Sequence, residues 1–461
     1  MDLALALLAL LPLALPVLWL WRLLAPRGAR RWLVVGYGLL GGLLGWPLLL
    51  RGLDALGIPL APGLLWVLFV GLALATVLVP RGRPGAPAPV TNPGILPGGN
   101  GRLILVLLGA LLVLRLGGLA LEVYWRPLYP FDATMHWATK ARVWSAYREL
   151  LPFVDNAQWL LEVDGRVFTD HHPAYPRTVP LLQAWMALAV GYWHPSLVNL
   201  PWLLCVLALG AAFYGQAREA GAQPLAALVF LWFLLTLPLL NTHVALAGYA
   251  DLLLGTAYCL ALMALFNAIQ QGARWQWVLA FGCALGCALI KNEGFFWMLT
   301  LLPACWAAWR GGPGLLLAMA AVGAVAVAVL LFFPRELVVA GHSLASLDLY
   351  YRPGSLAAIG RSLFLFDNWH FGAWLPPVLL ALVAWRAPWG LRQCAPVLAA
   401  LGSALVLFIF LFTCTQFAIG AIRHTAVGRI SLHLLPASLF LAGLLYGYLL
   451  QESQLAKKEE R

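Results

Sequence analysis

Residues 250–269 read ADLLLGTAYCLALMALFNAI, and the only charge in this run is an aspartate near its start. A helix that crosses the hydrocarbon core of a bilayer needs about 20 apolar residues, so the stretch predicts a membrane-spanning helix. The whole 461-residue chain has a similar character, because 62% of it is hydrophobic and only 10% is charged. So few charges cannot cover a soluble domain. The sequence therefore predicts an all-α polytopic membrane protein and excludes soluble enzymes, disordered scaffolds and disulfide-stapled secreted domains.

Similar apolar runs lie on both sides of this stretch. We expect 13 spanning helices, near residues 3–24, 32–50, 62–79, 103–121, 198–214, 225–241, 250–269, 276–290, 294–309, 314–333, 374–386, 396–416 and 430–450. A further run at 177–193 is short, contains Gln183 and ends in Gly191-Tyr192-Trp193-His194-Pro195. We interpret the segment 177–197 as interfacial, because counting it as a crossing would move five arginines of the later short loops to the outer side, against the positive-inside rule.

The same rule fixes the orientation and the organisation of the chain. The net charge of +11 then reflects arginines in cytoplasmic loops, and we expect no nucleic-acid partner. We expect the N-terminus outside and the tail 451–461 in the cytoplasm. We divide the rest into three accessory spans (1–79), a Pro/Gly-rich cytoplasmic linker (80–102) and a main module (103–450) with outer loops at 122–176 and 334–373. Most acids then lie on the extracytoplasmic face.

The first outer loop carries the richest cluster of ionisable residues. Asp132, His136 and Lys140 recur every four residues and would share one face of an amphipathic juxtamembrane helix that we expect over 133–148. An adjoining apolar stripe could rest on the bilayer surface, and it consists of Ala133, Trp137, Ala141 and Trp144. The alternative for Asp132 is that it only caps the start of this helix.

Four further clusters fall on the same predicted face, and each has a structural alternative. They are Asp251 before an apolar helix, Lys291 with Glu293 between two helices, Asp170-His171-His172 followed by Tyr175, and Arg423-His424 followed by Arg429 and His433. Asp251 could be a helix cap, and Lys291 and Glu293 could form an ion pair at a helix end. The two adjacent histidines could hold a metal, although no three-ligand helical spacing supports this. Arg429 could simply extend toward the membrane interface.

Together these clusters would supply a carboxylate to take a proton and cations to bind an anion. Such a combination suits a sugar donor linked to a lipid phosphate. The chain has no GxxxxGK-type phosphate loop, which fits a donor delivered through the bilayer in place of a cytosolic nucleotide sugar.

The motifs resemble those of the GT-C integral membrane glycosyltransferases, particularly bacterial enzymes related to protein O-mannosyltransferases and lipid A aminoarabinose transferases. The resemblance covers about 103–440. It rests on five short motifs, which are Pro130-Phe131-Asp132-Ala133 with His136 and Lys140, His171-His172-Pro173-Ala174-Tyr175-Pro176, Gly248-Tyr249-Ala250-Asp251, Lys291-Asn292-Glu293-Gly294 and Arg429-Ile430-Ser431-Leu432-His433-Leu434-Leu435-Pro436.

The resemblance implies a GT-C fold in a bacterial inner membrane, a polyprenyl-phosphate-linked sugar donor and an extracytoplasmic acceptor that is a glycan, a lipid or a protein. It implies that Asp132 is the catalytic base and that Asp251 supports the site. A divalent cation, Mg²⁺ or Mn²⁺, would be held by Asp132 and Asp251. Lys291, Arg429 and the region of His172 would contact the lipid-linked phosphate. The first three spans lie outside the resemblance.

Two other classes of protein are compatible with these residues. An O-antigen ligase or polymerase also uses lipid-linked sugars, but it would need a large late outer loop rich in Arg and His. A transporter or flippase could use Asp251 and Lys291 to gate a pathway, and such proteins often contain repeated halves and broken helices. The sequence shows neither feature clearly.

Overall fold

A computed structural model describes residues 1–78, 80, 99–162, 165–310 and 345–459, together with scattered residues between 317 and 343. Most of the predicted linker 80–102 and of the predicted span 314–333 lies outside the described residues, as does part of the late outer loop 334–373. The described chain is almost entirely helical, and it confirms the expected all-α membrane protein.

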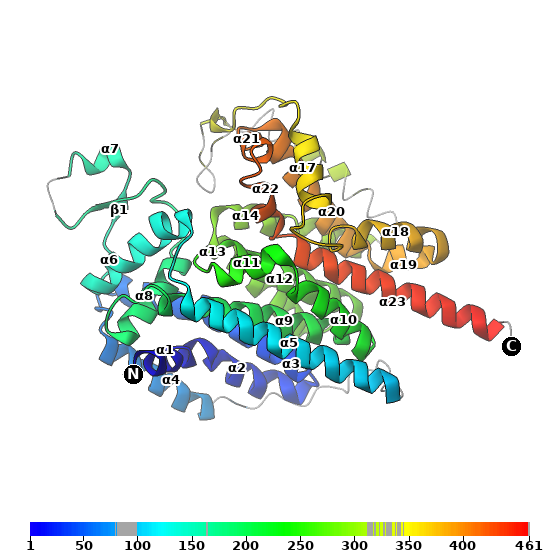
Figure 1. Cartoon of the computed structure of the whole chain (residues 1–461), viewed down its shortest axis with the longest axis horizontal. Coiled ribbons are helices and arrows are strands. Elements are labelled where there is room, and N and C mark those ends of the chain that lie inside the picture. The colour runs from blue at the N-terminus through cyan, green and yellow to red at the C-terminus, as the bar shows by residue number, and fades with distance from the viewer. Residues whose placement is uncertain are drawn as a thin grey trace.

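The long helices run side by side in a bundle (Figure 1). The N-terminal half contains α1 (Asp2–Leu8), α2 (Leu11–Leu24), η1 (Ala25–Arg27), α3 (Arg31–Ala55), α4 (Pro62–Leu78), α5 (Gly99–Trp125), η2 (Ala133–Ala138), α6 (Thr139–Tyr147), β1 (Phe153–Val154), α7 (Asn156–Trp159), β2 (Phe168–Thr169), α8 (Thr178–Val190), η3 (Leu197–Asn199) and α9 (Pro201–Glu219). The C-terminal half contains α10 (Pro224–Leu235), α11 (Pro238–Ala245), α12 (Asp251–Gln271), α13 (Arg274–Ile290), α14 (Asn292–Leu299), α15 (Leu302–Arg310), η4 (Ala345–Leu347), α17 (Ser355–Phe364), α18 (Leu375–Arg386), α19 (Pro388–Gln393), α20 (Ala395–Cys414), α21 (Ala418–Ile422), α22 (Val427–Ser431) and α23 (Leu435–Glu459).

Six described helices are long and apolar enough to cross a membrane, and the number is seven if the bent pair α10–α11 forms one span. They are Asp2–Arg27, Arg31–Ala55, Asn100–Trp125, Leu197–Glu219, Asp251–Gln271 and Ala395–Cys414. The structure does not confirm the remaining predicted spans. Several correspond to helices shorter than 18 residues, such as Pro62–Leu78, Arg274–Ile290 and Leu375–Arg386, and the predicted span 294–309 is broken between α14 and α15.

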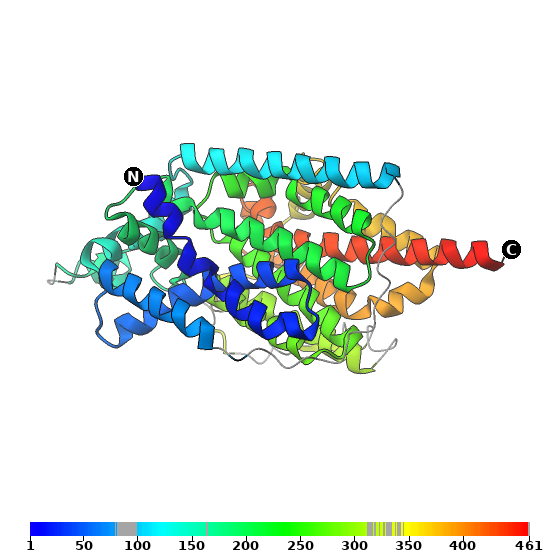
Figure 2. The same cartoon turned by 90° about the horizontal axis from the view of Figure 1, so that it is seen from below.

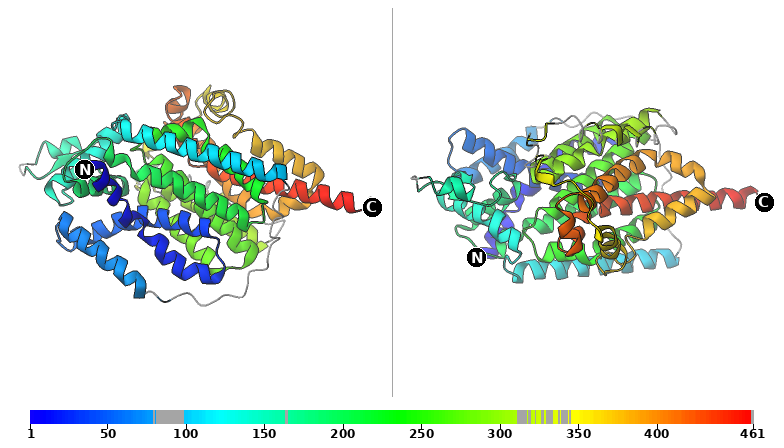
Figure 3. Two further views of the ribbon diagram at one scale, coloured as in Figure 1. Left: turned by 60° about the horizontal axis from the view of Figure 1, so that its bottom comes forward. Right: turned by 90° about the horizontal axis from the view of Figure 1, so that it is seen from above.

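The bundle has a buried centre and an exposed periphery. Helix α12 lies at the centre, and 94% of its most apolar 18-residue stretch is buried by protein. Helix α5 runs along the outside, and only 11% of the corresponding stretch is buried (Figure 2). Prolines in the first turn begin α9, α10, α11, α18 and α20, where a missing N–H costs no hydrogen bond. The first outer loop gathers at one end of the bundle, and α23 extends to the opposite end (Figures 1 and 3).

The first outer loop forms the helix that its sequence predicts, with two differences. The helix begins with a π-helical turn (η2) before α6, and Arg148 ends it in the left-handed conformation. The predicted membrane-facing stripe is wrong, because Ala133, Trp137, Ala141 and Trp144 are at most 2% exposed. These residues pack inward, and α6 lies against α8. The exposed apolar residues beside Asp132 are Phe131 and Met135.

The segment 177–197 is also placed differently from the expectation. Its helix α8 has 13 residues, too few to span a bilayer, as predicted. However, nearly every side chain of α8 is buried by protein, so it belongs to the core and is not a surface helix. Trp185 of α8 packs edge-on against Trp46 of α3 and donates a hydrogen bond from Nε1 to the Ala9 carbonyl at 2.8 Å.

The three N-terminal helices pack closely on the main module. Helix α3 lies along α9, where any side chain at Gly36 would clash with the backbone of Ala212. A buried polar network then joins α3 to α9 and α13: Gln216 donates through Nε2 to the Tyr37 hydroxyl and to Gln276 Oε1, both at 2.8 Å. Helix α3, which we assigned to the accessory spans, is therefore packed against α9 and α13 of the main module.

Candidate functional site

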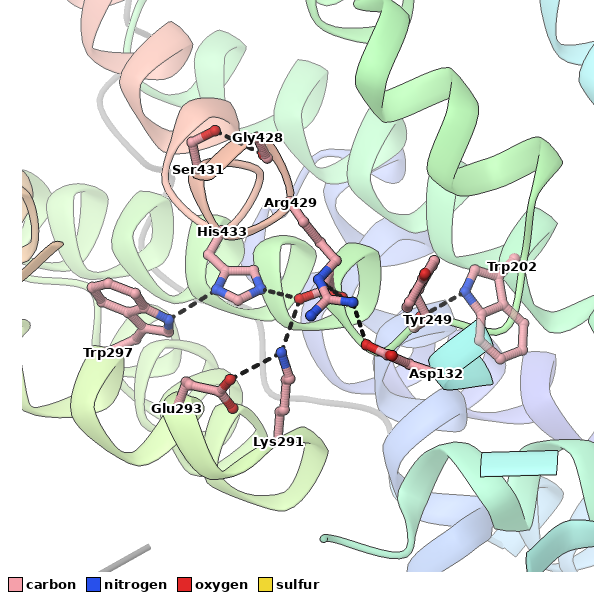
Figure 4. Close-up of polar contacts among 11 residues, drawn as sticks. Asp132, Trp202, Tyr249, Lys291, Glu293, Trp297, Gly428, Arg429, Ser431 and His433 are labelled. Atoms are coloured by element: carbon pink, nitrogen blue, oxygen red, sulfur yellow. Dashed lines mark hydrogen bonds and ion pairs between the residues drawn. The ribbon is translucent and has the colours of Figure 1, made fainter. Parts of the chain in front are cut away.

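A cluster of acids and cations lies where α12, α13, α14 and α22 meet the first outer loop (Figure 4). Arg429 of α22 bonds the Asp132 carboxylate through Nη1. The guanidinium Nε lies 3.6 Å from Asp251 Oδ2, and the group packs over the Tyr249 ring, 5.1 Å from its centroid. Arg429 therefore connects two acids that come from different parts of the chain. We call Asp132, Asp251, Lys291, Glu293, Arg429 and His433 the charged cluster.

Asp251 is the buried centre of the charged cluster. Its Oδ1 accepts from Lys291 Nζ at 3.1 Å and lies 2.9 Å from His433 Nε2. Lys291 also pairs with Glu293 at 3.0 Å, so the predicted Lys291–Glu293 pair exists but is part of a larger network. Trp297 Nε1 donates to His433 Nδ1 at 3.0 Å, which fixes the imidazole toward Asp251. The side chain of Asp132 is 35% exposed and that of Asp251 only 2%, so the cluster runs from the surface into the core.

Two glycines allow the segments of the charged cluster to approach each other. Gly248 has a φ of +109°, and any Cβ there would lie 2.8 Å from the Ala133 Cβ and 2.5 Å from Leu128. Gly255, one turn into α12, would place a Cβ 2.6 Å from the Leu432 carbonyl oxygen. The absence of these side chains brings the Asp251 segment against the outer loop on one side and against the α22–α23 junction on the other.

A second cluster lies within the outer loop, and we call His136, Lys140, Asp170, His172 and Tyr175 the loop cluster. Asp170 is buried, and its carboxylate contacts His136 Nδ1 at 2.6 Å and Lys140 Nζ at 2.5 Å. Lys140 Nζ also donates to the His172 carbonyl at 2.9 Å. Burial opposes ionisation of Asp170, but the hydrogen bonds from His136 and Lys140 outweigh it and lower the pKa of the carboxyl to about 2.

Aromatic rings complete the loop cluster and connect it to the charged cluster. Tyr175 stacks on Trp137 at 4.9 Å and on His172 at 4.8 Å between ring centroids. Burial raises the pKa of Tyr175 to about 12; Glu293 adds to this rise, whereas Lys291 and Arg429 oppose it. The Tyr175 hydroxyl therefore lies within electrostatic reach of the charged cluster.

The predicted common face of Asp132, His136 and Lys140 is only partly right. His136 and Lys140 converge on Asp170, whereas Asp132 turns to Arg429. The helix between them starts with a π turn, so α-helical spacing does not hold from 132 to 138. Asp132 makes no side-chain capping hydrogen bond, which leaves the capping alternative without support in the structure.

Three predicted residues do not join either ionic network. Arg423 and His424 are exposed, and the His424 ring packs 4.9 Å from Phe366. His171 is exposed, and its ring meets the His172 ring edge-on. Sequence reasoning assigned no role to Tyr249, Trp297 and Trp202. The indole Nε1 of Trp202 donates to the Tyr249 carbonyl at 2.9 Å. The two tryptophans lie in apolar runs, where nothing in the sequence separates them from packing residues.

The donor set around Asp251 does not fit a divalent cation. Lys291 and His433 approach Oδ1, and Arg429 faces Oδ2, so an added dication would meet like charge on each side. Asp132 is likewise paired with Arg429. Within the described residues, no group of three or more His, Cys, Asp and Glu side chains has the geometry of a metal site.

Comparisons with known proteins add nothing to this description of the site. No protein-family model matches the chain, and no curated protein or solved structure matches it either.

Proposed function

We propose that the chain is a membrane glycosyltransferase that moves a sugar from a polyprenyl-phosphate donor to an extracytoplasmic acceptor. The main support is the charged cluster, in which Asp132 and Asp251 meet Lys291 and Arg429 at one end of the bundle. Transfer from a glycosyl phosphate needs a carboxylate where a proton leaves and cations where a phosphate develops charge. The cluster supplies both kinds of group within a few ångströms of each other.

The distribution of basic residues supports an extracytoplasmic site. Arg218 and Arg274 lie at the ends of α9 and α13 that are remote from Asp251 and Lys291. By the positive-inside rule this basic end belongs in the cytoplasm. Near Asp132, Trp125 and Tyr129 are 69% and 77% exposed, as expected for aromatic residues at a membrane–water interface. A bacterial inner membrane with the charged cluster on its outer side is part of the proposal.

The proposed reaction assigns a role to each member of the charged cluster. The bond from the anomeric carbon to the phosphate oxygen breaks, and its electron pair stays on the phosphate. The acceptor hydroxyl oxygen forms the new bond to that carbon, and its proton passes to Asp132. Arg429 and Lys291 would stabilise the departing phosphate. Arg429 Nε makes no hydrogen bond among the described residues and only a 3.6 Å ion-pair contact with Asp251, so a phosphate oxygen could compete for this donor.

The charge arrangement suggests why Asp132 becomes a base only when the donor is bound. In the free protein the Asp132 carboxylate is held in an ion pair by Arg429. A donor phosphate would compete for the same guanidinium. Once Arg429 turns toward the phosphate, Asp132 is free to accept the proton of the acceptor.

An apolar cavity near α22 could hold the isoprenoid chain of the donor. Its volume is about 570 Å³, and its lining includes Trp232, Phe233, Phe364, Phe366, Phe371 and Trp374. Asn368 links this region to the charged cluster. The Asn368 carbonyl accepts a hydrogen bond from Leu239 N at 3.1 Å, and the Asn368 side chain lies close to Gly428, the residue before Arg429: a Cβ built on Gly428 would be 3.5 Å from Asn368 Nδ2.

A transporter is the second candidate function, and one observation favours it. Helices α10 and α11 meet at a 61° bend, and broken helices that flank a buried charged cluster are common in transporters. An O-antigen ligase or polymerase shares the donor class, and the identity of the transferred glycan would separate it from the first proposal.

The direct test uses the purified full chain with a radiolabelled polyprenyl-phosphate sugar and a cell-envelope extract. We expect label to appear in the extract, and we expect Asp132→Asn to lower the rate of its transfer by about 10²–10⁴-fold. Mass spectrometry of envelope glycans from cells with and without the protein then identifies the product. Labelled donor that crosses vesicle membranes without cleavage would support the transporter and contradict the transferase.

A further inference from the structure

His136 in the loop cluster is held ready to bind a ligand. Its Nδ1 lies 2.6 Å from the Asp170 carboxylate, so whenever the ring carries a single proton, that proton lies on Nδ1 and the lone pair on Nε2. No described residue hydrogen-bonds this Nε2, and the side chain is 11% exposed. Asp170 itself is fixed from a third direction, because its backbone N–H donates to the Val154 carbonyl at 3.0 Å. The imidazole therefore has a fixed orientation and an unused acceptor.

The charge of the loop cluster favours an uncharged ligand. The Asp170 carboxylate and the Lys140 ammonium, both buried, neutralise each other. Burial lowers the pKa of His172, and the neighbouring His136 adds to this, so His172 is neutral at physiological pH. The charged cluster, in contrast, contains two cations, Lys291 and Arg429, which an anion can contact. The two clusters thus differ in the chemistry that they can bind.

The rings of the loop cluster favour a sugar among uncharged ligands. The His172 ring stacks on Tyr175 and meets His136 edge-on at 4.8 Å, and His172 is exposed. A pyranose presents apolar C–H groups on its face and hydroxyls at its rim. The C–H groups pack on a π face, while the rim hydroxyls hydrogen-bond to a group such as His136 Nε2.

We propose that the loop cluster binds the acceptor and that the acceptor is a saccharide. This inference rests on the proposed glycosyltransferase function. It assigns the donor phosphate to the charged cluster and the acceptor sugar to His136, His172 and Tyr175. Asp170, which the sequence groups with His171 and His172, is a positioning residue that orients His136. Tyr175 stacks on His172 and completes the proposed acceptor site.

The first test compares transfer with donor hydrolysis in the purified full chain, using the radiolabelled donor and oligosaccharides released from cell envelopes by mild acid. Water can replace the acceptor, so hydrolysis needs the charged cluster alone. We expect His136→Gln to raise the KM for the oligosaccharides about tenfold, as for one lost hydrogen bond, with hydrolysis unchanged. Asp170→Asn should do the same, whereas Asp132→Asn should remove both reactions. His424→Gln, at an exposed site outside both clusters, is the matched control.

The second test uses the unaltered protein, because Asp170→Asn could misfold the loop. The oligosaccharides should reduce diethyl pyrocarbonate modification of His136 and His172 several-fold, as quantified by peptide mass spectrometry. Modification of the exposed His370 and His424 should not change. Transfer without such protection would overturn the assignment, and so would protection by serine-containing peptides in place of sugars. Protection without any cleavage of donor would retain the saccharide site and remove the proposed reaction.

Discussion

Arg429 bonds the carboxylate of Asp132, a residue 297 positions earlier in the chain. The contact exists only because the short helix α22 folds over the start of the first outer loop. Arg429 also faces Asp251, so one guanidinium holds together an exposed acid and a buried acid. An arginine in this position can transmit the arrival of an anion to Asp132, since any phosphate that binds Arg429 weakens its hold on that carboxylate.

Asp132→Asn should lower the rate of sugar transfer by about 10²–10⁴-fold, the usual contribution of a general base. Asparagine keeps the size of the side chain and can still contact Arg429, so the amount of protein in the membrane should not change. The measurement is transfer of radiolabelled sugar at saturating donor. Asp348→Asn is the control, because Asp348 is an exposed acid that also pairs with an arginine, Arg352. Full activity in Asp132→Asn would show that this carboxylate does not take the proton.

Lys291→Met should destabilise the fold by about 3–5 kcal/mol, because it leaves the buried Asp251 with one cation fewer. Adding Asp251→Asn should restore part of the loss, since the uncompensated charge is then removed. Thermal unfolding in detergent, followed by a dye that reacts with the buried cysteines, measures both effects.

Arg166→Met is the matched control for Lys291→Met, because Arg166 pairs with Glu149 at the surface with both side chains more than half exposed. An exposed pair of this kind contributes about 0–1 kcal/mol. Equal destabilisation by the two substitutions would mean that Lys291 is not part of a buried network.

The sequence predicted which residues belong to the charged cluster, but not which of them contact each other. A charge beside an apolar run, as at Asp251 and Lys291, is costly unless paired, and this cost made both residues visible in the sequence. Their actual partners depend on close helix approach at Gly255 and Gly248, which no local pattern reveals. Trp297 illustrates the same limit, because its hydrogen bond to His433 joins helices that are remote in the chain.

The predicted spans show a similar division. A run such as 250–269 is apolar at every turn and forms a full-length helix, α12. The run 294–309 is also apolar, but it is broken between α14, which ends at Leu299, and α15, which begins at Leu302. The stripe of Trp137 and Trp144 was assigned to the membrane because hydrophobic periodicity identifies an apolar face but not whether lipid or protein covers it.

The outer loop should lose stability at low pH through Asp170. The folded-state pKa of its carboxyl is about 2, below the ordinary value of 3.8, so ionised Asp170 stabilises the fold above pH 4 by about 2 kcal/mol. This contribution disappears as the pH falls from 4 toward 2, when His136 and Lys140 lose their anionic partner. Hydrogen exchange of residues 148–176 at pH 6 and pH 3 measures it. Asp170→Asn should exchange faster than the unaltered protein at pH 6 and show less change between the two values.

Chelation should not affect sugar transfer. The oxygens of Asp251 face Lys291, His433 and Arg429, and the lysine and arginine supply the positive charge that a Mg²⁺ ion would otherwise provide. We therefore expect equal rates with and without EDTA in protein purified without added metal. A rate that falls with EDTA and recovers with Mg²⁺ or Mn²⁺ would restore the metal site inferred from the sequence, and would require Arg429 to leave both acids when the ion binds.

Cysteine labelling should place the two ends of α12 on opposite sides of the membrane. The helix has 21 residues and is therefore roughly 30 Å long, which matches the hydrocarbon core. A membrane-impermeant maleimide should label Phe131→Cys in intact cells, and Gln271→Cys only after permeabilisation. Most native cysteines are buried, which keeps the background low.

Ala174→Cys and Tyr192→Cys flank α8, and both should react from outside, since a helix of 13 residues cannot carry the chain across. Outside labelling at 271 would place the charged cluster in the cytoplasm and contradict a periplasmic transferase.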